Sequence, residues 1–391
     1  MSTVCAACAE ATLVPFADLG DIPVLCGVHW ADAEAAAASP VGRMVLAYCP
    51  ACAYVRNVAF DPELMVYDTT MDTNLHHSPA FQAFSADLVK HLADRFRLGG
   101  KRVLDVGCGQ GEFLRELCHT AGCTGIGYDA MYAGPEGPDP SGAVFHSGYA
   151  PRGAALPPFD MVTSRHWFEH LNDPYEFLAD LRRQAGDRPV HGYLEIPDAG
   201  YDLATAGWEV IYPHVSYFDA YPLVRIVERA GWRVDDTGTL FGGMFRFIEM
   251  SANTSGDPTS DHRPTPEAVD RDRQLAAIAT FPQRHEAERT AWRARIGDLV
   301  DRGARPVLWG AGSRGVQFLT FADADKRLAG VVDVNPRKWG RYLPMTAHRV
   351  DAPETLTALK PAAVIITNPS YRTEIAAQLR DLGVEAELLV A

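Results

Sequence analysis

The stretch Val-Leu-Asp-Val-Gly-Cys-Gly-Gln-Gly at residues 103–111 decides the fold of this chain. Its first four residues form a short apolar run with one acid, which predicts a buried strand, and three glycines then form a loop. Residues 112–117 have helical spacing, and a second strand at residues 125–128 ends in Asp129. Because glycine has no Cβ, such a loop lets a ligand approach the backbone amides closely. The order strand, loop, helix, strand predicts a βαβ nucleotide-binding unit in an α/β domain.

In a βαβ unit, the acid that ends the second strand binds the hydroxyl pair of a ribose. Asp129 follows Asp105 by about 24 residues, close to the spacing expected of such an acid. Several nucleotide-binding folds share this arrangement, so the unit alone does not identify the nucleotide.

Further residues narrow the class. The pattern Val-Leu-Asp-x-Gly-Cys-Gly-x-Gly resembles motif I of class I S-adenosylmethionine (SAM) methyltransferases, and residues 159–171 look like the fourth strand of that family running into its catalytic edge. The resemblance implies a Rossmann-like core with SAM as cofactor; a Rossmann-type turn for another nucleotide is the alternative. The residues expected at the cofactor are Asp105, Gly107, Gly109, Gly111, Asp129, Arg165 and His166.

Composition limits the partners. The chain has 391 residues, 47% of them hydrophobic, and a formal net charge of −14. A negative charge of this size argues against a general nucleic-acid partner. No apolar run approaches the roughly 20 residues that span a bilayer, and the N-terminus has no signal-peptide pattern. We therefore expect a cytoplasmic protein that acts on a small molecule, without nucleic-acid or membrane partners, as a monomer or homodimer.

Two Cys-x-x-Cys pairs predict a metal site near the N-terminus. Cys5, Cys8, Cys49 and Cys52 can supply four thiolates in a tetrahedron, which structural zinc prefers. Four unrelated buried cysteines, or a redox pair, do not explain why the motif occurs twice. Cys26 and His29 lie between the pairs and are possible substitute ligands.

Motifs and composition divide the chain into five segments. We expect a zinc-binding module at 1–60, a connecting segment at 61–100 with a helix at 81–96, a SAM-binding domain at 101–250, a polar linker at 251–266, and a helix followed by a Rossmann-like domain at 267–391. Within the SAM-binding domain, strands are expected at 192–196, 232–237 and 245–250. The last two resemble the antiparallel hairpin that closes a methyltransferase sheet.

The C-terminal segment contains a second glycine loop. Residues 310–315 read Gly-Ala-Gly-Ser-Arg-Gly after an expected strand at 306–309, and a strand at 328–332 ends at Asp333. Three interpretations stay open: an NAD site, a loop that holds a substrate phosphate, or an accessory domain without a ligand. Asn368 follows an apolar strand at 362–367, at the sheet edge where such folds bind ligands.

The order of these segments resembles the sugar C-methyltransferases of antibiotic deoxysugar pathways over nearly the whole chain. That family methylates a carbon beside a ketone on a nucleotide-linked sugar. Residues 211–218 resemble its Tyr-x-His-x-x-Tyr-Phe signature, which implies that His214 is the base, with His170 as second polar group and Tyr212 as a catalytic neighbour. The residues expected to contact substrate are Tyr67, His77, Ser78, Tyr217 and Asn368. Alternatively, His214 only packs among aromatic rings and His170 only closes a turn.

Two positions depart from the family pattern. Pro213 stands where relatives carry a glutamate next to the base, and Met71 stands where they tend to carry a tyrosine. Proline removes both a carboxylate and a backbone donor. Transfer to oxygen or nitrogen of another metabolite is therefore the second hypothesis, because such acceptors need less help than a carbon acid. A scaffold that only binds SAM is the third.

Overall fold

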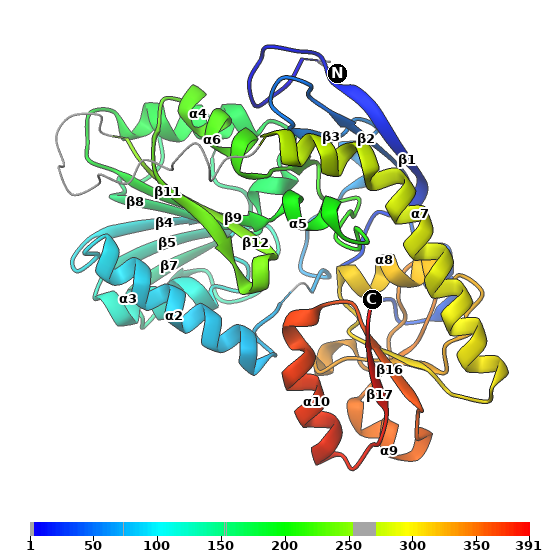
Figure 1. Cartoon of the computed structure of the whole chain (residues 1–391). Coiled ribbons are helices and arrows are strands. Elements are labelled where there is room, and N and C mark those ends of the chain that lie inside the picture. The colour runs from blue at the N-terminus through cyan, green and yellow to red at the C-terminus, as the bar shows by residue number, and fades with distance from the viewer. Residues whose placement is uncertain (1–3, 73, 152, 154, 253–270) are drawn as a thin grey trace.

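The computed structural model describes residues 4–72, 74–151, 153, 155–252 and 271–391. It contains three sheets joined by a long helix (Figure 1). Most of the expected linker, 251–266, lies outside the described residues. Among the described residues, no helix is long and apolar enough to cross a membrane.

The central sheet has the topology expected of a class I methyltransferase. Its eight strands lie in the order β11-β12-β9-β8-β4-β5-β7-β6. The strands are β4 (Arg102–Val106), β5 (Thr124–Asp129), β6 (Gly137–Pro138), β7 (Ala143–Ser147), β8 (Met161–Arg165), β9 (His191–Pro197), β11 (Arg233–Leu240) and β12 (Phe245–Ser251). Strands β9, β8, β4, β5 and β7 are parallel, whereas β12 pairs antiparallel with β9 and β11. This arrangement confirms the α/β fold class and the expected hairpin.

Helices cover both faces of the central sheet. Figure 1 shows α2 and α3 on one face, and α4 and α6 on the other. The helices of this part are α2 (Pro79–Arg95), α3 (Glu112–Ala121), α4 (Pro174–Ala185), α5 (Ala199–Ala204) and α6 (Ala220–Arg229). The glycine loop connects β4 to α3, so the carboxyl ends of the parallel strands face the expected cofactor.

The N-terminal module is not closed on itself. Strands β1 (Val14–Pro23), β2 (Val41–Tyr48) and β3 (Val55–Asn57) form its sheet, with α1 (Ala33–Ala37) between β1 and β2. The fourth strand is β10 (Ser216–Tyr217), which pairs antiparallel with β3 and belongs to the segment that contains His214. The spatial unit around residues 1–60 therefore includes residues from the middle of the chain.

The C-terminal domain is a second, smaller parallel sheet with helices. Its strands, in the order β15-β14-β13-β16-β17, are β13 (Val307–Trp309), β14 (Gly330–Val332), β15 (Val350–Asp351), β16 (Ala363–Ile366) and β17 (Glu387–Val390). The helices here are α8 (Ser313–Ala322), α9 (Leu356–Leu359) and α10 (Arg372–Asp381). Helix α7 (Arg271–Asp301) packs against β1, α5 and α8, and so ties the N-terminal module to both α/β parts.

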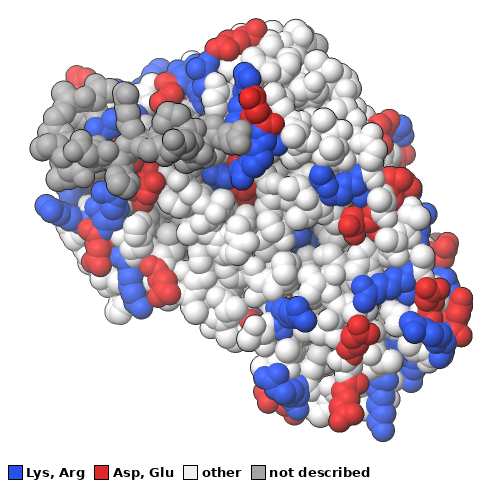
Figure 2. All heavy atoms as spheres, in the orientation of Figure 1, with Lys and Arg blue, Asp and Glu red and all other residues white. Residues whose placement is uncertain are grey.

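Charge is mixed over the surface. On the face that Figure 2 shows, Lys and Arg are interspersed with Asp and Glu rather than gathered into a basic stripe. This distribution agrees with the net charge of −14.

Candidate active site

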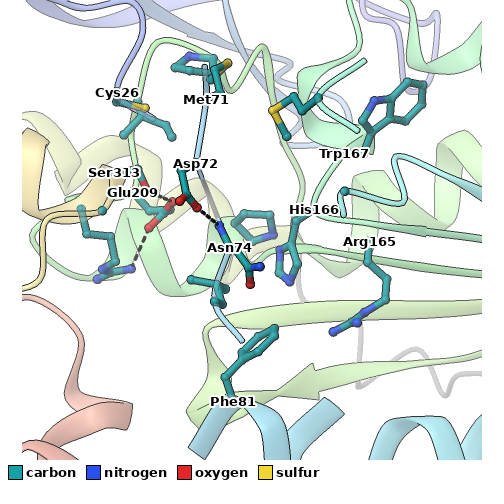
Figure 3. Close-up of a pocket in the computed structure, with 18 of the residues that line it drawn as sticks. Cys26, Met71, Asp72, Asn74, Phe81, Arg165, His166, Trp167, Glu209 and Ser313 are labelled. Carbon is teal, nitrogen blue, oxygen red and sulfur yellow. Dashed lines mark hydrogen bonds and ion pairs between the residues drawn. The ribbon is translucent and has the colours of Figure 1, made fainter. Parts of the chain in front are cut away.

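A cavity of about 620 Å³ lies where the three parts meet. Both glycine loops line it, and so do the connecting segment and the segment that contains His214. Figure 3 shows Arg165, His166 and Trp167, which follow one another from the end of β8, across the cavity from Glu209 and Ser313. Most of the residues that the sequence selects are thus brought to one site.

The first glycine loop is shaped by backbone that only glycine adopts easily. Gly107 has φ of 81°, and a Cβ there would lie 2.3 Å from the Trp167 ring. The amide of Gly109 donates to Asp129 Oδ2 at 2.8 Å, and Met131 N donates to Oδ1 at 2.7 Å. Burial raises the pKa of Asp129, and these two bonds partly oppose it. Asp129 thus fixes the loop while facing the cavity, as a ribose-binding acid requires.

Asp105, the acid inside β4, is bonded to the neighbouring strand β8. Asp105 is 2% exposed and accepts a hydrogen bond from Thr163 Oγ1 at 2.7 Å. Burial raises its pKa to about 6. Gly111 is the residue just before α3 and, unlike Gly107 and Gly109, does not line the cavity.

Arg165 and His166 share one buried acid. Arg165 Nη2 lies 2.9 Å from Glu195 Oε1, and its guanidinium lies 4.5 Å from the centre of the Phe113 ring. His166 Nε2 also lies 2.9 Å from Glu195 Oε1, and His166 has φ of 52°, a strained value outside glycine. Both line the cavity, so a cationic and an imidazole group face the expected cofactor.

The site therefore fits SAM on three counts. The glycine loop exposes backbone amides, Asp129 offers carboxylate oxygens, and Arg165 offers positive charge for a ligand carboxylate.

The second glycine loop faces the same cavity but has a different chemistry. Asp333 Oδ2 accepts from Ala311 N at 2.7 Å and pairs with Lys338 Nζ at 3.0 Å. Burial alone would raise the pKa of Asp333, but Lys338 and the backbone amides of Asn335 and Ala311 bring it below its usual value. Unlike Asp129, the Asp333 carboxylate, which would bind the ribose of NAD, is held in an ion pair with Lys338. This arrangement favours a phosphate-holding loop over an NAD site.

The two candidate catalytic histidines lie together. The ring centres of His170 and His214 are 5.0 Å apart, and both line the cavity. His170 Nδ1 lies 2.8 Å from Pro213 O and 3.2 Å from Tyr67 Oη. Burial lowers the pKa of His170 to about 4, and burial together with the nearby His170 and His166 lowers that of His214 well below its usual value. Both rings are therefore neutral bases at neutral pH.

Glu169 is a functional candidate that the sequence analysis did not select. Its side chain is 3% exposed, and Oε1 lies 3.9 Å from Nε2 of both His170 and His214. Neither carboxylate oxygen has a hydrogen-bond partner among the described residues. Burial raises the pKa of Glu169 well above its usual value. Its only signal in sequence is its place beside His170 at the end of a strand.

Two tyrosines of the His214 segment lie outside the cavity lining. Tyr212 is fully buried against Phe60, and its hydroxyl accepts a hydrogen bond from Asp61 N at 2.8 Å. The Tyr217 hydroxyl donates to Ile211 O at 3.1 Å. Both hydroxyls thus serve the packing of this segment in the structure, and the catalytic role of Tyr212 and the substrate contact of Tyr217 stay predictions.

The other expected substrate residues do line the cavity: Tyr67, His77, Ser78 and Asn368. Met71 lines the cavity too, and its backbone pairs with that of Val28.

The four paired cysteines converge as expected. Cys5 Sγ lies 3.5 Å from Cys52 Sγ, and Cys8 Sγ lies 3.6 Å from Cys49 Sγ. All four sulfur atoms lie within 4.8 Å of one another and are buried. A tetrahedron with Zn–S bonds of about 2.3 Å requires S–S separations of about 3.8 Å, so the residues fit zinc. Cys26 lines the cavity instead and His29 Nε2 contacts Ala311 O at 3.0 Å, so neither substitutes as a ligand.

Comparisons with known proteins agree with a methyltransferase. Residues 76–237 match a family model described as a methyltransferase domain, and residues 241–390 match one described as a C-methyltransferase C-terminal domain. Together with the sheet topology, these matches identify the chain as a SAM-dependent methyltransferase. No curated protein matches the chain.

Solved structures with the same kind of domain are distant. A SAM-dependent methyltransferase from Mesorhizobium loti is 17% identical, with 42% of this chain and 99% of that chain covered and a TM-score of 0.33. The 1,6-didemethyltoxoflavin-N1-methyltransferase of Burkholderia thailandensis is 15% identical, with 45% of this chain and 79% of that chain covered and a TM-score of 0.33. The magnesium protoporphyrin IX methyltransferase of Synechocystis PCC 6803 is 16% identical, with 44% of this chain and 83% of that chain covered and a TM-score of 0.34.

The cysteine cluster predicts one zinc per chain. Replacing Cys5 by serine removes a thiolate from a closed site, so the variant should lose zinc and unfold at lower temperature. Metal analysis of freshly purified protein, with thermal unfolding, measures both. Cys26→Ser is the matched control and should keep its zinc; full zinc in Cys5→Ser would contradict the assignment.

The Asp129 geometry predicts a loss of cofactor affinity. Asp129→Ala removes the acceptor for the ribose hydroxyls and also releases the amide of Gly109, and both effects weaken SAM binding. Hydrogen bonds to a charged group contribute about 1.5–3 kcal/mol each, so calorimetry should show affinity at least about tenfold lower. Asp333→Ala removes the corresponding acid of the second loop and should leave SAM affinity unchanged. If SAM affinity fell in Asp333→Ala and stayed unchanged in Asp129→Ala, SAM would bind at the second glycine loop and the present assignment would be wrong.

Proposed function

We propose that this methyltransferase transfers the methyl group to a carbon beside the ketone of a nucleotide-linked sugar, with His214 as the base. The observation that carries the proposal is that one cavity is lined by both glycine loops and by two neutral imidazoles, those of the buried His214 and the partly buried His170. Such a cavity can hold the cofactor at one loop, an anionic group at the other, and a reacting carbon near the imidazoles.

A carbon acceptor is supported by the C-terminal match. The family model over residues 241–390 is described as a C-methyltransferase C-terminal domain. A nucleotide-linked substrate is supported by basic side chains beside the second glycine loop. Arg337 lines the cavity there, as do Arg314 and Lys338, which are paired with Glu209 and Asp333. Backbone amides at the start of α8 and basic side chains together suit a diphosphate.

In this mechanism the protein provides position and a base. When bound, SAM supplies an electrophilic methyl group, held by Asp129, the first glycine loop and Arg165. His214, neutral because it is buried, accepts the acidic proton next to the substrate carbonyl. Tyr67 and His170 offer hydroxyl and imidazole groups to the substrate oxygens. Zinc has a structural role only, because its four cysteine ligands leave no open position.

Transfer to oxygen or nitrogen is the second candidate. It is favoured by one observation, the strongly lowered pKa of His214, which makes this ring a weak base when it is considered alone. A hydroxyl or amine acceptor would tolerate such a base better than a carbon acid would.

The acceptor atom can be determined directly. The purified enzyme is incubated with SAM carrying a ¹³C-labelled methyl group and a panel of nucleoside-diphosphate 4-keto sugars, with matched 4-hydroxy sugars as controls. We expect a product whose labelled carbon is coupled to a ring carbon. A label on oxygen or nitrogen, or methylation of the 4-hydroxy controls alone, would exclude carbon transfer.

His214→Gln tests the base. Glutamine keeps some of the shape and hydrogen bonding but cannot accept a proton, so turnover should fall by about 10²–10⁴ while SAM affinity stays nearly intact. Exchange of the substrate α-proton with deuterated solvent should be lost. His91 lies on α2 and outside the cavity lining, so His91→Gln is the control that retains both activities. Near-normal turnover in His214→Gln would show that the His214 imidazole is not the base.

A further inference from the structure

A buried base needs a partner for the charge it gains. When His214 accepts a proton it becomes an imidazolium whose side chain is only 6% exposed, with two further histidines nearby that make this charge less favourable. Pro213, the preceding residue, has no carboxylate to compensate. A compensating charge must therefore come from elsewhere in the fold.

Glu169 has the required position. It belongs to the short helix η2 (Phe168–His170), which follows β8 in the SAM-binding domain. Its carboxylate oxygen lies 3.9 Å from Nε2 of His214 and 3.9 Å from Nε2 of His170. The backbone fixes this placement, because Val215 N donates to Glu169 O at 2.9 Å. The carboxylate thus points at both rings while its own backbone holds the segment that carries His214.

The carboxylate of Glu169 is otherwise unused. It is fully buried, and neither oxygen has a hydrogen-bond partner among the described residues. Leaving a buried acceptor unsatisfied costs about 1–3 kcal/mol, and more for a charged group. A buried carboxylate without a partner calls for an explanation, and a catalytic role is one of those known in proteins. A glutamate kept here at that cost is expected to gain its partner during the reaction.

We propose that Glu169 is the positioning residue that replaces the missing acid at Pro213, and that it stabilises the imidazolium of His214. The inference rests on the proposed role of His214 as base. The His214 nitrogen accepts the α-proton, and the electron pair of the C–H bond becomes the enolate. Glu169 balances the new positive charge at 3.9 Å. After methyl transfer, the proton leaves through Glu169 to His170, whose side chain is 20% exposed.

The proton that His214 takes from the substrate can be shared within this group. His170 Nδ1 donates to Pro213 O, so its Nε2 faces Glu169 as a lone pair. An imidazolium beside a carboxylate, or a carboxylic acid beside an imidazole, each satisfies Glu169. The other titratable groups that act on this cluster are His166, Glu195, Glu209 and Tyr67. Of these, Glu195 is paired with Arg165, and Glu209 lies 3.5 Å from Arg314.

Two imidazoles and a carboxylate could also hold a metal ion, since the three ligand atoms lie within 4.8 Å of one another. Metal-bound imidazoles could not act as bases. A metal at this cluster is therefore an outcome that would overturn the proposal.

The test follows the His214 ring in the whole protein without substrate. Protein with ¹⁵N-labelled histidine is titrated by NMR, with the His214 signal assigned from the His214→Gln variant. In the wild type, the ring should bind a proton within the range where the protein is folded. In Glu169→Gln, its titration should move down by about 1–3 pH units or out of the range, because an opposite charge at this distance is lost. Glu112→Gln, another cavity acid, is the control that should leave the titration unchanged.

Rescue separates a charge effect from a structural one. In Glu169→Gln/Pro213→Glu, a carboxylate returns next to His214, and the titration should move back toward the wild-type value. Glu169→Asp keeps the charge and should give an intermediate value, and it replaces Glu169→Gln if that variant does not fold.

Several results would overturn the proposal. They are an unchanged titration in Glu169→Gln, no rescue by Pro213→Glu, or a second metal per chain that is lost in Glu169→Gln. If Glu169→Gln leaves the ring unchanged while His214→Gln abolishes proton exchange, only the Glu169 proposal fails. If the titration shifts but His214→Gln keeps its turnover, the proposed function fails instead.

Discussion

The pairing of β3 with β10 is the constraint on which the site depends. Val55 pairs with Tyr217 and Arg56 with Ser216, and the Tyr54 hydroxyl lies 2.6 Å from Ser216 Oγ. On the other side, the backbone of Val215 is bonded to Glu169. The His214 segment is therefore held between the N-terminal module and the end of β8, and neither part alone would fix it.

This constraint gives the cysteine cluster a consequence beyond local stability. Cys49 and Cys52 immediately precede Tyr54 and β3, and the amide of Cys49 donates to Tyr54 O at 2.8 Å. A metal bound by Cys49 and Cys52 would also fix β3, the strand that pairs with β10. The position of the His214 imidazole is thus linked to the cysteine cluster through one turn and two short strands.

Local signals made the fold predictable, and long-range contacts limited the prediction of the site. The glycine loop, Asp129 and the paired cysteines each follow a short pattern with a direct physical meaning, and the structure brings each to the expected place. The β3–β10 pairing joins residues about 160 positions apart, and its two-residue strand has no periodicity to detect. Tyr212 matched a family signature, but its hydroxyl is turned to the backbone of Asp61 by packing that a signature does not record. Lys338 was missed because its pairing with Asp333 depends on a turn after the strand.

In the proposed mechanism, the histidine–acid pair is divided between two parts of the molecule, so the chemistry requires that these parts are docked. Glu169 comes from the end of a strand in the SAM-binding sheet, whereas His214 comes from the segment added to the N-terminal sheet. In that mechanism, a chain in which β10 had not paired with β3 would lack the charge-compensated base.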